Sequence, residues 1–214
     1  MNLTKLFETQ KALRDRINYQ REDRFEKLIL ALLVELGECA NEWRGFKFWS
    51  KDQESRTFKR INCPDCLEKG FTPYNRPRQK DYFCDTCAGY LIIDTNPLLE
   101  EYADGLAFIL EIGLETYSYF DVKLPIAFSE IDTKPLKHES VTKQFNNLFC
   151  SVTYLDDCVG DRKFSVAMET EAQYQFLVRE YIGLGEMLGF TWEQIEQAYY
   201  AKMQINHQRQ ATGY

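Results

Sequence analysis

Two glutamates three residues apart stand at the border of an apolar helix face. The stretch 28–50, LILALLVELGECANEWRGFKFWS, has apolar residues at helical spacing, and Glu35 and Glu38 fall on one stripe beside them. Residues three apart are neighbours on a helix, about 5–6 Å between Cβ atoms. Two such anions resist burial unless a positive charge lies between them. The pair therefore fits either a solvated acidic edge or a site for a divalent cation such as Mg²⁺, which prefers oxygen ligands.

A second helical stretch, 97–117, repeats this arrangement. Glu101 and Asp104 are again three residues apart beside an apolar face. Two helices that each offer a carboxylate pair can face one another across a bundle core. Neither stretch contains a histidine, and ligation by oxygen alone favours Mg²⁺ or Mn²⁺ over iron or zinc. The two pairs, Glu35 with Glu38 and Glu101 with Asp104, are therefore the candidate ligands of two or more Mg²⁺ ions.

A different metal-binding pattern lies between these two helices. Two CxxC pairs, Cys63 with Cys66 and Cys84 with Cys87, are separated by 17 residues. This spacing is typical of a zinc ribbon or knuckle, in which four thiolates hold one structural Zn²⁺ and leave no position open for water. We expect 52–96 to be an inserted zinc module that emerges from one end of the bundle.

The insert also carries a basic cluster, Arg76, Arg78 and Lys80, between its cysteine pairs. Contact with nucleic acid, contact with a protein and simple bracing are all compatible with this cluster. Nearby acids and thiolates offset its charge, which favours bracing or a protein partner. The net charge of −7 also argues against nucleic acid as a general partner, since such binding relies on a basic surface.

Helical spacing of apolar residues continues through most of the remaining chain. The other predicted elements are helices over 3–18, 139–155 and 164–188, a connection with a short helix over 120–137, and a turn over 156–162. Asp23 is expected to cap the second helix, which should end near Gly45. Thr191 and Gln194 form a capping box for the last helix. The predicted fold class is therefore all-α, a helical bundle with a small zinc-ribbon or knuckle-like insert.

Length and composition fit one soluble domain with an insert. We expect 1–51 and 97–214 to form the helical domain and 52–96 the zinc module. Of the 214 residues, 44% are hydrophobic and 28% charged, which is typical of soluble proteins. No apolar run approaches the ~18 residues of a membrane span, and the charged N-terminal segment is unlike a secretory signal. Because the seven cysteines need no disulfide framework, we expect a cytoplasmic protein.

With these motifs in view, the chain resembles a known family. The ExxE motif followed by ANEWRGFKFWS, then EExADxLxF and a closing YxxKxxxNHxRQxxGY, is similar to the dimeric, all-α deoxyuridine triphosphatases. These belong to the wider all-α nucleoside triphosphate pyrophosphatases, which include the MazG-like enzymes. ExxE with ExxD alone would indicate only that superfamily. The FKFWS stretch and the C-terminal motif narrow the resemblance to the deoxyuridine triphosphatases. The resemblance covers most of the chain but not 52–96.

The resemblance implies hydrolysis of dUTP to dUMP and pyrophosphate, and hydrolysis of dUDP is compatible with it. Metal ions held by the four carboxylates would neutralise the triphosphate and orient a water for in-line attack at the α-phosphorus. Glu35 is the first candidate to accept the proton of that water. Lys202 and Arg209 would stabilise developing phosphate charge. The resemblance also implies a homodimer, paired through helices such as 98–114, in the cytoplasm of a bacterium or of a phage-infected host.

Five further residues are candidates for contact with the nucleotide. Gln10 lies on the apolar stripe of the first helix, where it either bonds neighbouring backbone or, as in the family, recognises a pyrimidine edge. The resemblance assigns Trp49 to the uracil pocket and Lys47 to the phosphate side, although aromatic residues more often pack in a core. It also implies that Phe108 packs on the deoxyribose and excludes a 2′-hydroxyl, and that Asn206 faces the base or sugar.

Alternatives remain open at this point. Lys202, Asn206 and Arg209 share one helix face, which by itself also fits a solvated basic face. Many family members have histidine where this chain has Ala107, so any contact made by that side chain is missing. A related pyrophosphatase acting on dCTP or another nucleotide is the second functional reading. A zinc-ribbon binding or regulatory protein on a vestigial enzyme fold is the third, and the complete set of four carboxylates argues against it.

Overall fold

The structure, a computed structural model, describes residues 3–77, 82–119, 128–160 and 164–213. Its described part is mostly helical with a single small sheet, which confirms the predicted fold class. None of the described helices combines the length and the apolar character that crossing a membrane would require.

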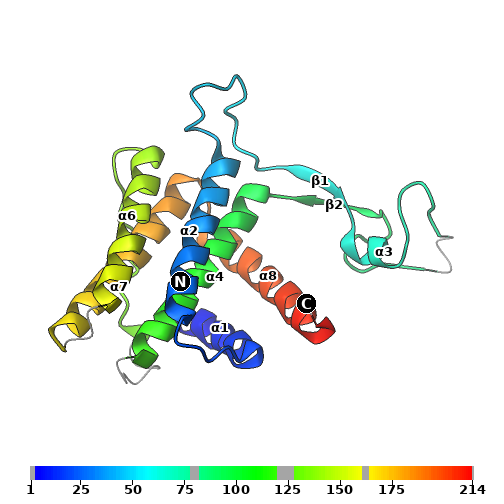
Figure 1. Cartoon of the computed structure of the whole chain (residues 1–214). Coiled ribbons are helices and arrows are strands. Elements are labelled where there is room, and N and C mark those ends of the chain that lie inside the picture. The colour runs from blue at the N-terminus through cyan, green and yellow to red at the C-terminus, as the bar shows by residue number, and fades with distance from the viewer. Residues whose placement is uncertain (1–2, 78–81, 120–127, 161–163, 214) are drawn as a thin grey trace.

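Two long helices, α2 (Arg24–Trp43) and α4 (Pro97–Tyr119), pack side by side at the centre of the bundle (Figure 1). On α2 the buried apolar residues recur every three or four positions, so the helix has one apolar face. α4 is apolar over a wider arc because α1, α2, α7 and α8 all contact it. Burying each large apolar side chain contributes about 1.5–3 kcal/mol, so this packing is the main force that holds α2 against α4.

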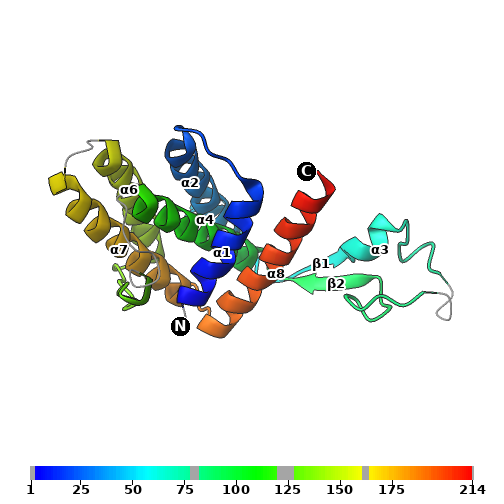
Figure 2. The ribbon, with the colours of Figure 1, turned by 90° about the horizontal axis from the view of Figure 1, so that it is seen from below.

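Two pairs of outer helices cover this central pair. α1 (Leu3–Ile17) and α8 (Trp192–Thr212) contact one another and both contact α4. α6 (Val141–Gly160) and α7 (Phe164–Met187) form a second pair, which contacts α2 and α4 from the other side. Figure 2 shows the two outer pairs on opposite sides of α4. The arrangement leaves α2, α4, α1 and α8 around a common space.

Small residues and buried tyrosines set the close approach of α4 and α7. The Tyr102 hydroxyl donates to the Tyr181 carbonyl at 2.9 Å, and the Tyr181 hydroxyl donates to the Tyr102 carbonyl at 2.6 Å. Both tyrosines are fully buried, so these reciprocal bonds satisfy polar groups that water cannot reach. A Cβ atom on Gly185 would lie 2.5 Å from the Tyr102 hydroxyl oxygen. Glycine at this position therefore makes room for the tyrosine pair inside a continuous helix.

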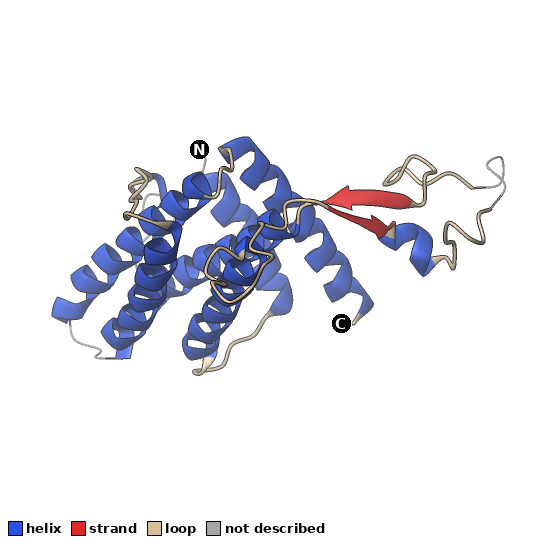
Figure 3. Cartoon of the chain, turned by 90° about the horizontal axis from the view of Figure 1, so that it is seen from above, coloured by secondary structure: helices blue, strands red, loops and turns tan. Residues whose placement is uncertain are grey.

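The insert leaves the bundle as an antiparallel two-stranded hairpin. β1 (Lys59–Asn62) pairs with β2 (Ile92–Thr95), with Ile61 opposite Ile93. A short helix, α3 (Pro64–Glu68), follows β1, and Figure 3 shows the hairpin and α3 projecting away from the helices. Because β1 follows α2 and β2 precedes α4, the insert emerges from one end of the bundle, as its sequence position predicted.

Two local predictions were wrong. The Asp23 carboxylate makes no capping bond to α2; it accepts a hydrogen bond from the Tyr19 hydroxyl at 2.7 Å and pairs with Lys27 at 2.8 Å. The predicted turn over 156–162 is helical as far as Gly160, because Cys158 and Val159 continue the buried stripe of α6. The capping box at the start of α8 is confirmed.

Several expected features lie outside the described residues. They are Arg78 and Lys80 of the basic cluster, Tyr214 of the C-terminal motif, residues 161–162 of the predicted turn, and 120–127 of the predicted connection.

We predict that Gly185→Ala lowers the free energy of unfolding by about 1–3 kcal/mol, because its Cβ would force Tyr102 out of its place against α7. Thermal unfolding of the variant and the wild type measures this.

Gly37→Ala is the matched control, because a Cβ at Gly37 on α2 would meet nothing within 4 Å. There the same substitution should raise the free energy of unfolding by up to about 1 kcal/mol through helix propensity alone. Equal effects at the two positions would show that α4 and α7 do not depend on this close approach.

Candidate active site

A pocket of about 570 Å³ opens between α1, α2, α4 and α8. Sequence reasoning assigned eleven bundle residues to catalysis or substrate binding, and the pocket is lined by these seven of them: Gln10, Glu35, Asp104, Phe108, Lys202, Asn206 and Arg209. Four helices separated widely in sequence thus place the predicted residues around one cavity.

Three carboxylates gather at one end of this pocket. Glu35 on α2 and Glu101 and Asp104 on α4 each offer an oxygen, and these oxygens lie within 4.8 Å of one another. The Lys202 ammonium group on α8 pairs with the Asp104 carboxylate. The fourth predicted ligand, Glu38, is exposed and does not belong to this close group. Its role as a ligand stays a prediction.

The pKa values of these carboxyl groups report their crowding. Burial, and then the Asp104 and Glu38 charges, raise the pKa of Glu35 to about 7. Burial and the same two neighbours, with Glu35 in addition, raise the pKa of Glu101 to about 7. Burial also raises the pKa of Asp104, although its bond to Lys202 opposes the shift. All three groups are therefore destabilised as anions by their surroundings.

This donor set fits Mg²⁺. The group offers carboxylate oxygens alone, which hard cations prefer, and it lacks the nitrogen and sulfur ligands typical of zinc sites. A divalent cation among the oxygens would remove the repulsion that raises their pKa values. Protons and the cation should therefore compete for the same oxygens.

The other end of the pocket is formed by a buried amide and the side chains that bond to it. The Gln10 amide on α1 is buried and donates to the Glu111 carboxylate on α4 at 3.0 Å. The Tyr199 hydroxyl lies 3.1 Å from the Gln10 carbonyl oxygen and 3.2 Å from the Leu6 carbonyl. Gln10 thus bonds to side chains from two other helices, and the expectation that its partner is neighbouring backbone is not met.

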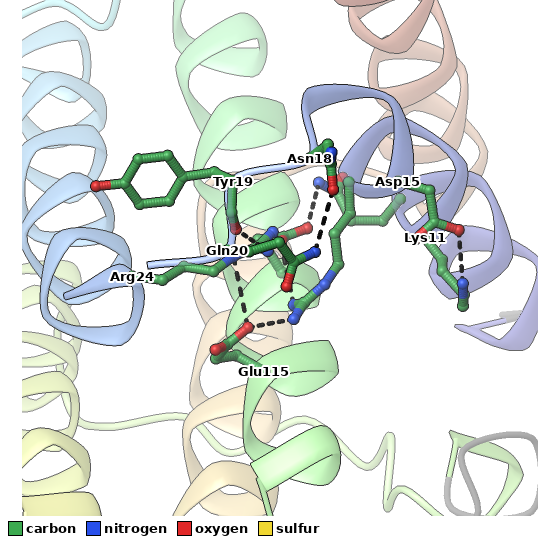
Figure 4. Close-up of polar contacts among 10 residues, drawn as sticks. Lys11, Asp15, Asn18, Tyr19, Gln20, Arg24 and Glu115 are labelled. Atoms are coloured by element: carbon green, nitrogen blue, oxygen red, sulfur yellow. Dashed lines mark hydrogen bonds and ion pairs between the residues drawn. The ribbon is translucent and has the colours of Figure 1, made fainter. Parts of the chain in front are cut away.

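Two arginines complete this polar end. Arg14 and Arg24 both pair with Glu111, and both also pair with Glu115 one turn further along α4. Figure 4 shows Arg24 and Glu115 beside the connection from α1 to α2. Sequence analysis did not identify Arg24 and Glu111, which line the pocket. A signal was present, because Glu111 and Glu115 fall seven and eleven residues after Asp104 and continue its stripe on α4.

Apolar side chains separate the two ends. Leu28 and Ala31 on α2 and Ala107 and Phe108 on α4 line the middle of the pocket. At 1.5 Å per residue, the seven residues from Asp104 to Glu111 span about 10 Å. A molecule with an anionic end, a flat apolar middle and a polar far edge would match this sequence of surfaces.

Four predicted residues are not among those that line this pocket: Glu38, Glu101, Lys47 and Trp49. Of these, Glu101 belongs to the close carboxylate group beside the pocket. Lys47 donates to the Asn41 side chain, and Trp49 is 65% exposed, with its ring against Phe46 and Phe48. Both follow the end of α2, so the contacts with nucleotide that the family resemblance assigns to them stay predictions.

The four cysteines of the insert form a separate, buried cluster. The Sγ atoms of Cys63 and Cys84 lie 3.7 Å apart, and those of Cys66 and Cys87 lie 3.5 Å apart. Around a tetrahedral zinc with bonds of about 2.3 Å, sulfur atoms are about 3.8 Å apart. A bond from the Cys87 backbone lowers the pKa of the Cys84 thiol to about 6, which favours the thiolate that binds metal. The four positions therefore fit one tetrahedral metal ion.

Comparison with known families decides the relationship. A family model described as dUTPase matches residues 2–67 and 92–214. The chain belongs to the dUTPase family. This membership supports the conclusion that the protein is a hydrolase and that its substrate is a nucleotide. None of the curated proteins compared with the chain matches it.

The dUTPase family match also bears on the insert. The stretch that it leaves out, 68–91, lies within 52–96 and holds Cys84 and Cys87. Half of the cysteine cluster is therefore outside the part of the chain shared with the family. The helices that build the pocket all lie inside the shared part.

We predict that Glu101→Gln stabilises the metal-free protein more at pH 8 than at pH 5. The folded pKa of Glu101, about 7, lies above the value of about 4.3 for an unfolded glutamate, so the wild type loses stability as pH rises through this window. The amide carries no charge and avoids this loss. Thermal unfolding in a chelator at the two pH values measures the difference.

Glu100→Gln, at an exposed neighbouring position, is the control and should show no such growth with pH. With saturating Mg²⁺ at pH 8, the wild type should instead be more stable than Glu101→Gln, because the wild type gains more stability from binding the ion. A Glu101→Gln effect that is the same at both pH values would contradict the crowding of these carboxylates.

Proposed function

We propose that the protein is a Mg²⁺-dependent dUTP diphosphatase, which hydrolyses dUTP to dUMP and pyrophosphate. The observation that carries the proposal is the pocket itself, with Glu35, Glu101 and Asp104 at one end and the buried Gln10 amide at the other. Family membership supports the class of reaction. The order of surfaces along the pocket matches a nucleoside triphosphate bound with its phosphates at the carboxylates.

The phosphate end would work as follows. When bound at Glu35, Glu101 and Asp104, Mg²⁺ supplies neutralisation of phosphate charge and polarises water. Attack by water in line at the α-phosphorus releases pyrophosphate, and Glu35 accepts the proton of that water. Lys202 and Arg209 line the same end and stabilise the negative charge on the phosphate oxygens. A diphosphate has the same α-phosphorus, so dUDP is a second expected substrate.

The nucleoside would occupy the rest of the pocket. Phe108 offers an apolar surface to the sugar, and Asn206 lines the same wall from α8. Gln10 lies at the far end, where an amide presents a donor and an acceptor to the edge of uracil. Ala107 leaves open the space where many relatives have a histidine, so Gln10 would carry much of the choice of base.

We also propose that the cysteine cluster holds one structural Zn²⁺. Leu91 packs on the four cysteines, and its backbone N–H donates to the Cys87 sulfur at 3.2 Å, a bond that suits a thiolate ligand. The cluster has its own small apolar surround and shares no residue with the pocket described above. Its role is therefore to fold the insert.

A homodimer is proposed as well. The apolar arc 98–114 is covered by helices of the same chain, so it does not supply the pairing surface that the sequence suggested. Exposed apolar side chains lie instead at Leu30 and Val34 on α2. A second copy placed there would bury them. Sedimentation as a monomer at micromolar concentration would contradict the dimer.

The activity prediction uses Glu35→Gln. Losing a metal ligand and the proposed proton acceptor should lower kcat for dUTP by about 10²–10⁴-fold. Release of pyrophosphate from dUTP, dCTP, dTTP and UTP, and of phosphate from dUDP, measured with Mg²⁺, tests both the reaction and the substrate.

Glu26→Gln, an exposed change on the same helix, should keep wild-type turnover. Wild-type turnover in Glu35→Gln would remove that residue from the mechanism. No release of pyrophosphate from any nucleotide would refute the proposed function.

The zinc prediction uses Cys63→Ser. The purified wild type should contain about one equivalent of zinc, and the variant should lose it and expose the insert to proteolysis. Helical content should change little, because the cluster is separate from the bundle core.

Cys150→Ser is the control, since Cys150 is exposed on α6 and lies outside the cluster. It should retain the zinc. A metal-free wild type with a protease-resistant insert would contradict the structural zinc.

A further inference from the structure

The buried carboxylate of Glu111 bonds to Gln10 and to two cations. One of its oxygens accepts from the Gln10 amide nitrogen at 3.0 Å. The other accepts from Arg14 at 3.2 Å and from Arg24. Glu115 pairs with the same arginines, so two anions balance two cations at the end of the pocket. Because these groups are held on α1, α2 and α4, the position of Glu111 is set by three helices.

The charge on Glu111 determines how the Gln10 amide is turned. A carboxylate can only accept hydrogen bonds, so the amide must present its NH₂ group to Glu111 and its carbonyl oxygen to the other side. On that other side the Tyr199 hydroxyl, a possible donor, lies 3.1 Å from the carbonyl oxygen. Turning the amide by 180° would set its carbonyl oxygen against the carboxylate, which leaves two buried acceptors facing one another.

The fixed amide has one N–H and one carbonyl lone pair left for a ligand in the pocket. Uracil offers a matching edge, with O4 as acceptor and N3–H as donor. Cytosine has the reverse pattern, an amino group in place of O4 and an unprotonated N3. A freely turning amide could match either base, whereas an amide held by Glu111 matches uracil alone.

We propose that Glu111 is a specificity-determining residue that positions the Gln10 amide for uracil and against cytosine. This inference rests on the proposed function, in which Gln10 contacts the base. Glu111 acts through Gln10, so it is a positioning residue with no part in the chemistry at phosphorus. Removing the Glu111 carboxylate should therefore change the ratio of kcat/KM between dUTP and dCTP and should not abolish turnover of either nucleotide.

The test is the ratio of kcat/KM for dUTP to kcat/KM for dCTP in Glu111→Gln. The new glutamine can donate as well as accept, so it tolerates both orientations of the Gln10 amide. We expect the ratio to fall by about tenfold to a hundredfold, with kcat/KM for dCTP rising in absolute terms. A purely structural defect would lower both values together and leave the ratio unchanged.

Glu115→Gln is the matched control. It removes the same charge from the same two arginines, while Gln10 bonds to Glu111. It should keep the wild-type ratio. If Glu111→Gln does not fold, the double variant Glu111→Gln/Arg14→Gln restores charge balance and should show the same fall, against Glu115→Gln/Arg14→Gln as its control.

The outcomes separate this inference from the proposed function. A wild type that does not prefer dUTP over dCTP would refute the contact between Gln10 and uracil, and the inference with it. A wild type that prefers dUTP, together with a Glu111→Gln variant that keeps the ratio, would refute the positioning role alone. An equal fall in Glu115→Gln would assign the effect to the charge of the network and would also overturn the proposal.

Discussion

Repulsion among the carboxylates of α2 and α4 is the constraint on which the rest of the bundle depends. Glu35, Glu101 and Asp104 are held within 4.8 Å although burial and mutual charge make each anion unfavourable. Lys202 supplies one counter-charge from α8. The remainder is overcome by the apolar packing of the central helices against four neighbours. The protein thus holds open, at a cost in stability, a site that a divalent cation would relieve.

α4 can hold these carboxylates in place because one of its faces lines the pocket and another packs against α7. Toward the pocket it presents carboxylates, then Phe108, then Glu111, at intervals of three and four residues along one stripe. On its other side Tyr102 locks the helix to α7 through reciprocal hydrogen bonds. A slip of α4 by one residue would rotate the pocket stripe by about 100° and break these bonds together. Metal end, sugar surface and base end are therefore kept in register by one rigid helix.

The sequence was sufficient for the main helices and for part of the carboxylate group. Helical spacing located the central helices, and three of the four residues in the ExxE and ExxD pairs, Glu35, Glu101 and Asp104, do meet across α2 and α4. The Glu111 network was not predictable in the same way. Its bonds join residues 87 to 101 positions apart, and the stripe of α4 that carries Glu111 gives no sign of which arginines lie opposite it. The glycine at position 160 also led to a wrong prediction. It suggested a turn over 156–162, whereas α6 continues as far as Gly160.

The attachment of the insert explains how a metal module can interrupt the two helices that build the pocket. The Arg56 N–H donates to the Glu42 carbonyl at 3.0 Å, and the Leu98 N–H donates to the Arg56 carbonyl at 3.1 Å. These backbone bonds tie the end of α2 to the start of α4 before the chain reaches β1 and after it leaves β2. The ends of the inserted stretch are thereby held together by the bundle itself, so closing the loop adds little further entropy cost. The cysteine cluster then needs to fold only its own hairpin, and the spacing of Glu35 and Asp104 is set independently of it.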